Sequence, residues 1–344
     1  MSTAGIRAQA RLHHAWLLGL QLRVSISETP EAVGEWMFRL FRRQHEAKFL
    51  SSFEKLGLAG LPHAVACARY HVLSNNVGGV GVEYAEESDT KAWVRFRYPR
   101  WMYAGPTICG VPVEVSRGFL NGWYAQNGVS LGNPNLGFVC VSEDMTGQFG
   151  LCGYFVEEDR ALEPSERLRF APDELPPDFT RHAQPSLPEA DWNEERLEKA
   201  NRNYALEYLR NGLAALAAVL GSERTREHAR HAARLIGLQY QAETAALVGA
   251  VDGDLDEAVA YLVRMFEGMG DTVAVTHNGD ARRLEHRGLR IVRDLPAEEA
   301  DLLLDCWCEL FRGAMAAQRT MKTLDVRREP DALHWTLTRT PTAG

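Results

Sequence analysis

The sequence predicts an α+β protein made of two related units, each with the element order helix-helix-ββαββ and an antiparallel sheet. Residues 78–158 and residues 271–339 each contain two strand patterns, a helix pattern and two more strand patterns, and two helices precede each stretch. Strands are indicated by alternation, as in "KAWVRFRYP" (91–99), and helices by apolar residues three or four apart. Because the same order occurs twice, we interpret the chain as an internal duplication.

The first predicted unit spans residues 1–160 and is rich in aromatic residues. A helix begins at Pro30, which suits the first turn of a helix, and ends near Gly57 or Gly60. The next helix ends near Asn75, where strands begin. This second helix covers 61–76, and the remaining segments are strands in 78–87 and 91–99, a helix in 111–128, and a hairpin in 135–143 and 148–158.

A proline-rich linker is predicted from residue 161 to residue 192, because six prolines lie there among charged residues with little periodicity. The second unit, 193–344, begins with a long helix that ends at Gly221 and continues with two further helices. Its ββαββ stretch follows. With fewer aromatic residues than the first unit, it would be structural or serve dimerisation, and the binding site is expected in the first unit.

Composition limits the classes of function. The chain has 344 residues and a formal net charge of 38 − 46 = −8, which disfavours nucleic acid and anionic membranes as partners. Its six cysteines are scattered, which does not indicate a disulfide framework. Neither a signal peptide nor an apolar run of about 20 residues is evident. We therefore expect a cytoplasmic protein.

Candidate catalytic residues lie around the end of the second helix. Cys67 and His71 are four residues apart, which places them on one helix face. A thiolate beside an imidazolium is an activated nucleophile, so this pair could attack or shuttle protons. Glu83, in the next strand, would act as acid or base if burial raised its pKa. The structural alternative is a core cysteine with a hydrogen-bonded histidine.

Polar and aromatic residues of the following strands predict the substrate-binding groups. Arg95 and Arg97 would bind a carboxylate, because a guanidinium forms paired hydrogen bonds with it. The alternative is a solvent-facing strand surface with Glu–Arg pairs across strands. Aromatic residues would form the walls of the pocket. The full predicted binding set is Asn75, Lys91, Trp93, Arg95, Arg97, Trp101, Tyr103 and Trp123.

The layout resembles two kinds of known protein. Residues 230–339, with helices followed by a sheet ending in "LHWTLTR", resemble the bacterial L-2-amino-thiazoline-4-carboxylic acid hydrolase-like family and vinyl-reductase-type small-molecule-binding domains. The stretch "WYAQNGVSLGNPNLGFVCVSEDMTG" (123–147) of the first unit is similar. The resemblance implies a small-molecule ligand. No catalytic motif maps onto this chain, so the resemblance assigns no site residues.

Together these observations predict a cytoplasmic enzyme that acts on a small, polar, anionic organic molecule, with hydrolysis of a C–N bond as the favoured reaction and no cofactor. A homodimer is a possible assembly. One alternative is a metal-dependent enzyme that holds a divalent transition metal with His71, Glu83 and a further ligand. Others are a non-catalytic small-molecule sensor and a structural scaffold.

Overall fold

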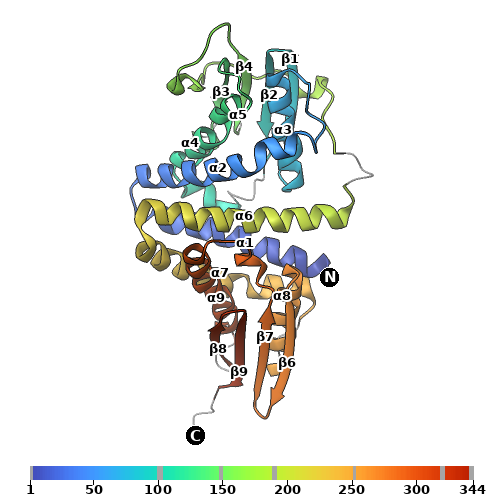
Figure 1. Ribbon diagram of the computed structural model, residues 1–344, viewed down its shortest axis with the longest axis vertical. Coiled ribbons are helices and arrows are strands. Elements are labelled where there is room, and N and C mark those ends of the chain that lie inside the picture. The colour runs from blue at the N-terminus through green and yellow to red at the C-terminus, as the bar shows by residue number, and fades with distance from the viewer. Residues whose placement is uncertain are drawn as a thin grey trace. The chain divides into compact units, whose positions relative to one another are not determined.

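The computed structural model describes residues 3–98, 104–146, 150–187, 192–250, 253–317 and 322–340. It confirms the α+β class, and its elements are labelled in Figure 1. The chain divides into two compact units, residues 24–197 and residues 1–23 with 198–344. The N-terminal residues, expected in the first unit, thus group with the C-terminal half. The duplication remains a prediction: the four antiparallel strands of each sheet follow the same order, but the sheet of residues 24–197 has a fifth, parallel strand.

The unit of residues 24–197 places helices and a five-stranded sheet around an aromatic core. Its first helix is capped by Thr29, whose hydroxyl accepts a hydrogen bond from the amide of Ala32 at 3.3 Å. The elements are α2 (Pro30–Phe53), α3 (His63–Val77), β1 (Val82–Ser88), β2 (Lys91–Phe96), α4 (Val113–Gly122), α5 (Asn127–Ser130), β3 (Leu136–Ser142), β4 (Cys152–Glu157), β5 (Leu168–Phe170) and the 3-10 turn η6 (Phe179–Arg181).

The sheet of this unit is mixed, with the order β1-β2-β4-β3-β5. Its first four strands are antiparallel as predicted, but β5 runs parallel to β3, so the prediction of a purely antiparallel sheet is wrong here. The stretch predicted as a linker supplies this extra strand. Three residues are too few to show the alternation by which a strand is recognised in a sequence.

The other unit contains a bundle of long helices and an antiparallel sheet with the order β6-β7-β9-β8 (Figure 1). The predicted antiparallel pairing is confirmed for this sheet. The elements are α1 (Thr3–Ser25), α6 (Glu194–Leu220), α7 (Ser222–Val248), α8 (Leu255–Met269), β6 (Thr272–Asn278), β7 (Ala281–Arg287), α9 (Ala297–Ala316), β8 (Lys322–Glu329) and β9 (Ala332–Arg339).

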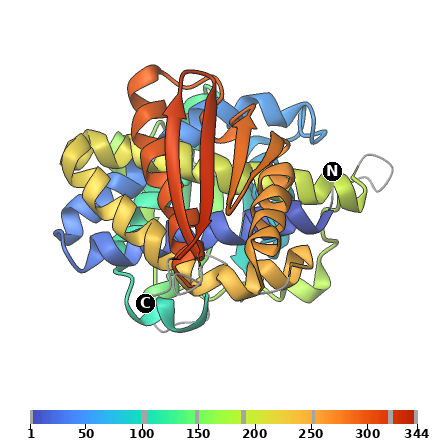
Figure 2. The ribbon, with the colours of Figure 1, turned by 90° about the horizontal axis from the view of Figure 1, so that it is seen from below.

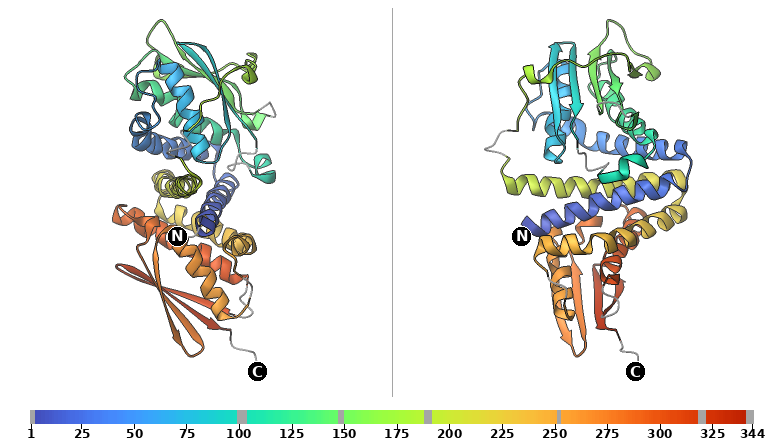
Figure 3. Two further views of the ribbon diagram at one scale, coloured as in Figure 1. Left: turned by 90° about the vertical axis from the view of Figure 1, so that its right-hand side faces the viewer. Right: turned by 180° about the vertical axis from the view of Figure 1, so that it is seen from behind.

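Helices cover one face of the four-stranded sheet. Leu333, Trp335 and Leu337 alternate along β9 and are all buried, so their face of the strand points into the core. Helices α8 and α9 contact the strands, and Figure 2 shows them beside the sheet. The opposite face is built largely from polar residues. Figure 3 shows the twist that the four strands share.

Helices α7 and α9 pack at very short range because each has a glycine at the crossing. A Cβ atom on Gly237 would lie 1.8 Å from the carbonyl oxygen of Leu310, and one on Gly313 would lie 2.0 Å from that of Arg234. Ion pairs flank the crossing: Arg234 of α7 lies 3.1 Å from Glu309 of α9. The two glycines therefore set the distance between the helices, and charged residues lie at the edge of the crossing.

The substitution Gly237→Ala should destabilise the protein by at least about 2 kcal/mol, because the added methyl group would overlap backbone rather than a movable side chain. In an unconstrained helix the same change would stabilise by about 1 kcal/mol. Chemical denaturation measures the difference. Gly34→Ala in α2 is the control, since its nearest neighbour would be Glu114 Cβ at an ordinary 3.4 Å. Equal effects of the two changes would contradict the prediction.

Candidate functional site

A groove of about 320 Å³ opens beside the start of β1. The loop between α3 and β1 forms one side, and its tight path requires Gly79, whose φ is 76°, a left-handed conformation that favours glycine. Residues around η6 form the other side. The lining residues are Asn76, Gly81, Val82, Glu83, Arg97, Phe179, Thr180, His182, Gln184 and Pro185. Two predicted site residues, Glu83 and Arg97, are among them.

The charged groups of the groove are arranged by the pairing of β1 with β2. Glu83 lies directly opposite Arg95, and Arg95 Nε donates a hydrogen bond to Glu83 Oε2 at 2.6 Å. The other oxygen, Oε1, is 4.0 Å from Arg97 Nε, beyond hydrogen-bond reach. The side chain of Arg97 is 68% exposed, against 19% for Glu83. Glu83 is thus already paired, and Arg97 faces solvent at the groove.

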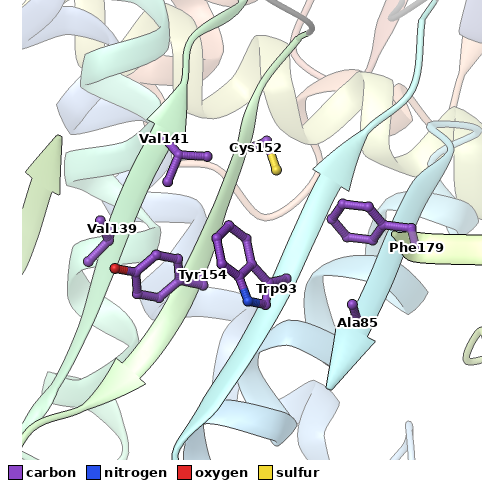
Figure 4. Packing of buried hydrophobic residues seen from close by; sticks show 7 residues of the cluster. All are labelled: Ala85, Trp93, Val139, Val141, Cys152, Tyr154 and Phe179. Carbon is purple, nitrogen blue, oxygen red and sulfur yellow. The ribbon is translucent and has the colours of Figure 1, made fainter. Parts of the chain in front are cut away.

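The wall of the groove comes from the stretch predicted to be a linker. Phe179 is buried on the sheet face that carries Trp93 and Tyr154, in the cluster of Figure 4. The guanidinium carbon of Arg95 lies 4.6 Å from the centre of the Phe179 ring, a cation–π contact. No pattern in the sequence indicates this role, because Phe179 stands alone among polar residues and prolines.

Gln184 attaches this wall to the free edge of β1. Its side-chain oxygen accepts a hydrogen bond from the amide of Tyr84 at 2.8 Å, and its side-chain nitrogen donates to the carbonyl of Tyr84 at 2.9 Å. The side chain therefore satisfies the strand edge as a neighbouring peptide group would. Sequence reasoning missed Gln184 as well, since a glutamine in a loop carries no pattern.

Lys91 and Trp93 lie on the same sheet face as Glu83 but belong to a different arrangement. Trp93 is 3% exposed and donates from Nε1 to Glu87 at 2.8 Å. Lys91 Nζ lies 4.3 Å from the centre of the Tyr154 ring. Both side chains are thus engaged with neighbours, but the burial of Trp93 does not fit the solvent-facing surface of the alternative. Neither residue lines the groove, while Trp101 and Tyr103 lie outside the described residues.

Cys67 and His71 lie in the core on the other side of the sheet. His71 is 2% exposed, and its ring stacks on Phe155, with 5.4 Å between centres. Burial raises the pKa of the Cys67 thiol, the opposite of the lowering that a nucleophilic cysteine needs. Asn75 donates to the backbone oxygen of His71. The arrangement favours the structural alternative for this pair.

A buried chain of hydrogen bonds explains why His71 is there. Asn127 Nδ2 lies 3.0 Å from His71 Nε2, and Asn127 Oδ1 lies 3.1 Å from His45 Nε2. Arg42 lies 3.1 Å from His45 Nδ1 and can only donate. The donor of every bond follows from this: Arg42 donates to His45, His45 donates to Asn127, and Asn127 donates to His71. Trp123, with its ring edge-on to His45, is part of this core.

The sheet separates His71 from Glu83. His71 contacts Phe155, whereas Glu83 shares its face with Ala85 and with Trp93, and successive residues of a strand point to opposite faces. A metal held jointly by these two side chains has no support in this arrangement. Across the described ranges, no group of three or more His, Cys, Asp and Glu side chains is placed to hold a metal ion.

No family model matches the chain, and no curated protein matches it either. The resemblance found in the sequence therefore remains an expectation about layout. None of the helices, in the part of the chain that the structure describes, is both long enough and apolar enough to cross a bilayer.

Stability should fall as the pH decreases from about 6.5 to about 4. Burial, and after it the charge of Arg42, lowers the pKa of His45 to about 4, so the unfolded chain, with an imidazole pKa of about 6.5, takes up a proton first. Each such histidine contributes up to about 1.4 kcal/mol per pH unit in this window. In His45→Gln the free energy of unfolding should depend less steeply on pH, because the contribution of one histidine is lost. Urea denaturation across the window measures it.

An identical pH dependence of the free energy of unfolding in the wild-type protein and His45→Gln would show that His45 does not stay neutral in the folded state.

Proposed function

We propose that the groove beside β1 binds a small organic anion, with the carboxylate of the ligand on Arg97. One observation carries this proposal: Arg97 is largely exposed at the groove, while the adjacent carboxylate, Glu83, is already neutralised by Arg95. A guanidinium in this position can form paired hydrogen bonds with an incoming carboxylate. The proposal keeps the predicted ligand class and the predicted role of Arg97.

The balance of charge in the groove supports an anion. Arg95, Arg97 and Glu83 lie next to one another here, and together they carry a net charge of +1. The C-terminal end of α3 opposes it, because a helix end carries roughly half a negative charge. That effect is weakened here, since the amides of Gly79 and Val80 donate to the last carbonyls of the helix at 3.1 Å and 2.9 Å. The full positive charge of Arg97 is larger than the partial negative charge that remains at the end of the helix.

The size and lining of the groove support a small ligand. Its volume of about 320 Å³ is at the lower end of the range for small-molecule sites. The partly exposed Pro185 offers an apolar surface, and the exposed Asn76 offers an amide that can donate and accept. The side chain of Gln184 is already engaged by the backbone of Tyr84. These features suit a short, partly apolar carboxylic acid.

Hydrolysis of a C–N bond remains the second candidate, and the presence of both Glu83 and His182 in the groove favours it. A carboxylate and an imidazole can activate water without a cysteine. The acid–base role of Glu83 is kept in this scheme, and His182 takes the role first given to Cys67 and His71. Turnover of short carboxylic amides by the wild-type protein, lost in His182→Gln, would distinguish an enzyme from a sensor.

A cytoplasmic location is also part of the proposal. All six cysteines are free thiols in the structure, and five of them are buried. Free thiols are typical of proteins in reducing compartments. Fractionation of cells that produce the protein with its native N-terminus tests the location.

Short mono- and dicarboxylates should bind the wild-type protein, and Arg97→Gln should weaken binding at least tenfold. The loss of a charged hydrogen bond, about 1.5–3 kcal/mol, corresponds to this change. Titration calorimetry measures the dissociation constants. Arg181→Gln is the matched control, because this arginine is 82% exposed and pairs with Asp178 outside the groove. Equal losses in both variants, or no binding by any acid, would refute the proposed site.

A further inference from the structure

The two edges of the four-stranded sheet differ sharply in charge. The sheet order β6-β7-β9-β8 makes β6 and β8 its edge strands. Strand β6, with the sequence TVAVTHN, contains no aspartate, glutamate, lysine or arginine. Strand β8 instead carries five charged side chains among its eight residues: Lys322, Asp325, Arg327, Arg328 and Glu329. Only one edge therefore has the charges with which proteins normally protect a strand from pairing.

Strand β6 is also accessible along almost its whole length. Six of its seven residues are exposed, and Val275 is an exposed large hydrophobic residue at 37%. An edge strand points the amide and carbonyl of alternate residues away from its sheet, ready to bond another strand. In Figure 1, β6 forms the outer side of its sheet. An uncharged, seven-residue edge of this kind is expected to be covered by a partner strand.

We propose that β6 pairs antiparallel with β6 of a second copy of this chain, across a twofold axis through Val275. Residue 275 is the midpoint of β6, so this register pairs all seven residues. It places Val275 opposite itself, Ala274 opposite Thr276, and Thr272 opposite Asn278. Residues that face each other lie on the same side of a sheet, so the helix-covered face stays continuous across the axis.

This register is favoured over its neighbours by the number of residues that it pairs. Shifting it by two residues in either direction moves the axis to Ala274 or to Thr276, and then only five residues of β6 pair with β6. A shift by one residue would place opposite faces side by side, which antiparallel pairing does not permit. In the proposed register no charged side chains meet. The result is an eight-stranded sheet shared by two chains.

Sedimentation equilibrium of the full chain tests the proposal, and we expect a dimer. In the variant A274K/T276K, the proposed register places two introduced lysines opposite each other at two symmetric positions. The dimer dissociation constant should rise at least tenfold. In A274K/T276E the same positions carry opposite charges, and the dimer should persist. Both sites are exposed, so both variants should keep the wild-type circular dichroism and melting temperature.

Two further variants make each outcome decisive. Thr323→Lys adds one charge to the other edge strand and should leave the dimer unchanged. Val275→Cys, in a Cys109→Ser background because Cys109 is the exposed native cysteine, should form a disulfide-linked dimer under mild oxidation. A monomeric wild-type chain, or a dimer unaffected by A274K/T276K, would overturn the proposal. Loss of the dimer in A274K/T276E as well would overturn the register.

Discussion

Neighbouring side chains of a β-strand point to opposite faces, and this alternation in β1 and β2 decides which functional groups can meet. Tyr84 and Val94 face the core that contains His71, whereas Glu83 and Arg95 face the other side. A shift of one residue in the register would exchange the two sets. The separation of buried histidines from exposed arginines therefore follows from the pleat, and every statement about the site depends on it.

The parts of the site differ in how firmly they are held. Strands β1 and β2 are fixed by a ladder that runs without a shift from Val82 to Glu86, before a bulge between Glu86 and Ser88, and by the core beneath them. The wall that carries Phe179 is held mainly by one buried ring, worth about 1.5–3 kcal/mol, and by the two bonds of Gln184, worth about 1 kcal/mol each. That sum is comparable with the binding energy of a small ligand. The wall is thus held less firmly than the strands.

Much of the fold could be predicted from the sequence, because its strong patterns are local. The alternation in 91–99 located β2, and the helical spacing before Gly221 located α6. The mixed pairing of β5 could not be predicted, since a three-residue strand shows no period. The grouping of α1 with the C-terminal half could not be predicted either. It depends on contacts between distant residues, such as the bond from Trp16 to the carbonyl of Ala229.

The site was predicted only in part, and the reason is again the range of the interactions. Glu83 and Arg95 were expected to pair or to bind substrate, and the pairing is what their register produces. Cys67 and His71 looked like a catalytic pair, because helical spacing shows proximity but not burial. Asn127 makes His71 a core residue, and it is 56 positions away in the chain. No local pattern links the two.

Asn127 also affects the chemical ageing of the protein. It is followed by Gly128, the neighbour that most favours ring closure and loss of the amide in flexible chains. Both residues are buried here, and their carbonyl oxygens accept hydrogen bonds from the amides of Leu131 and Asn133 at 3.0 Å and 2.9 Å, so the backbone has little freedom to cyclise. Folding therefore protects this amide. A chain that lost it while unfolded would carry a carboxylate that cannot donate to His71 and would refold poorly.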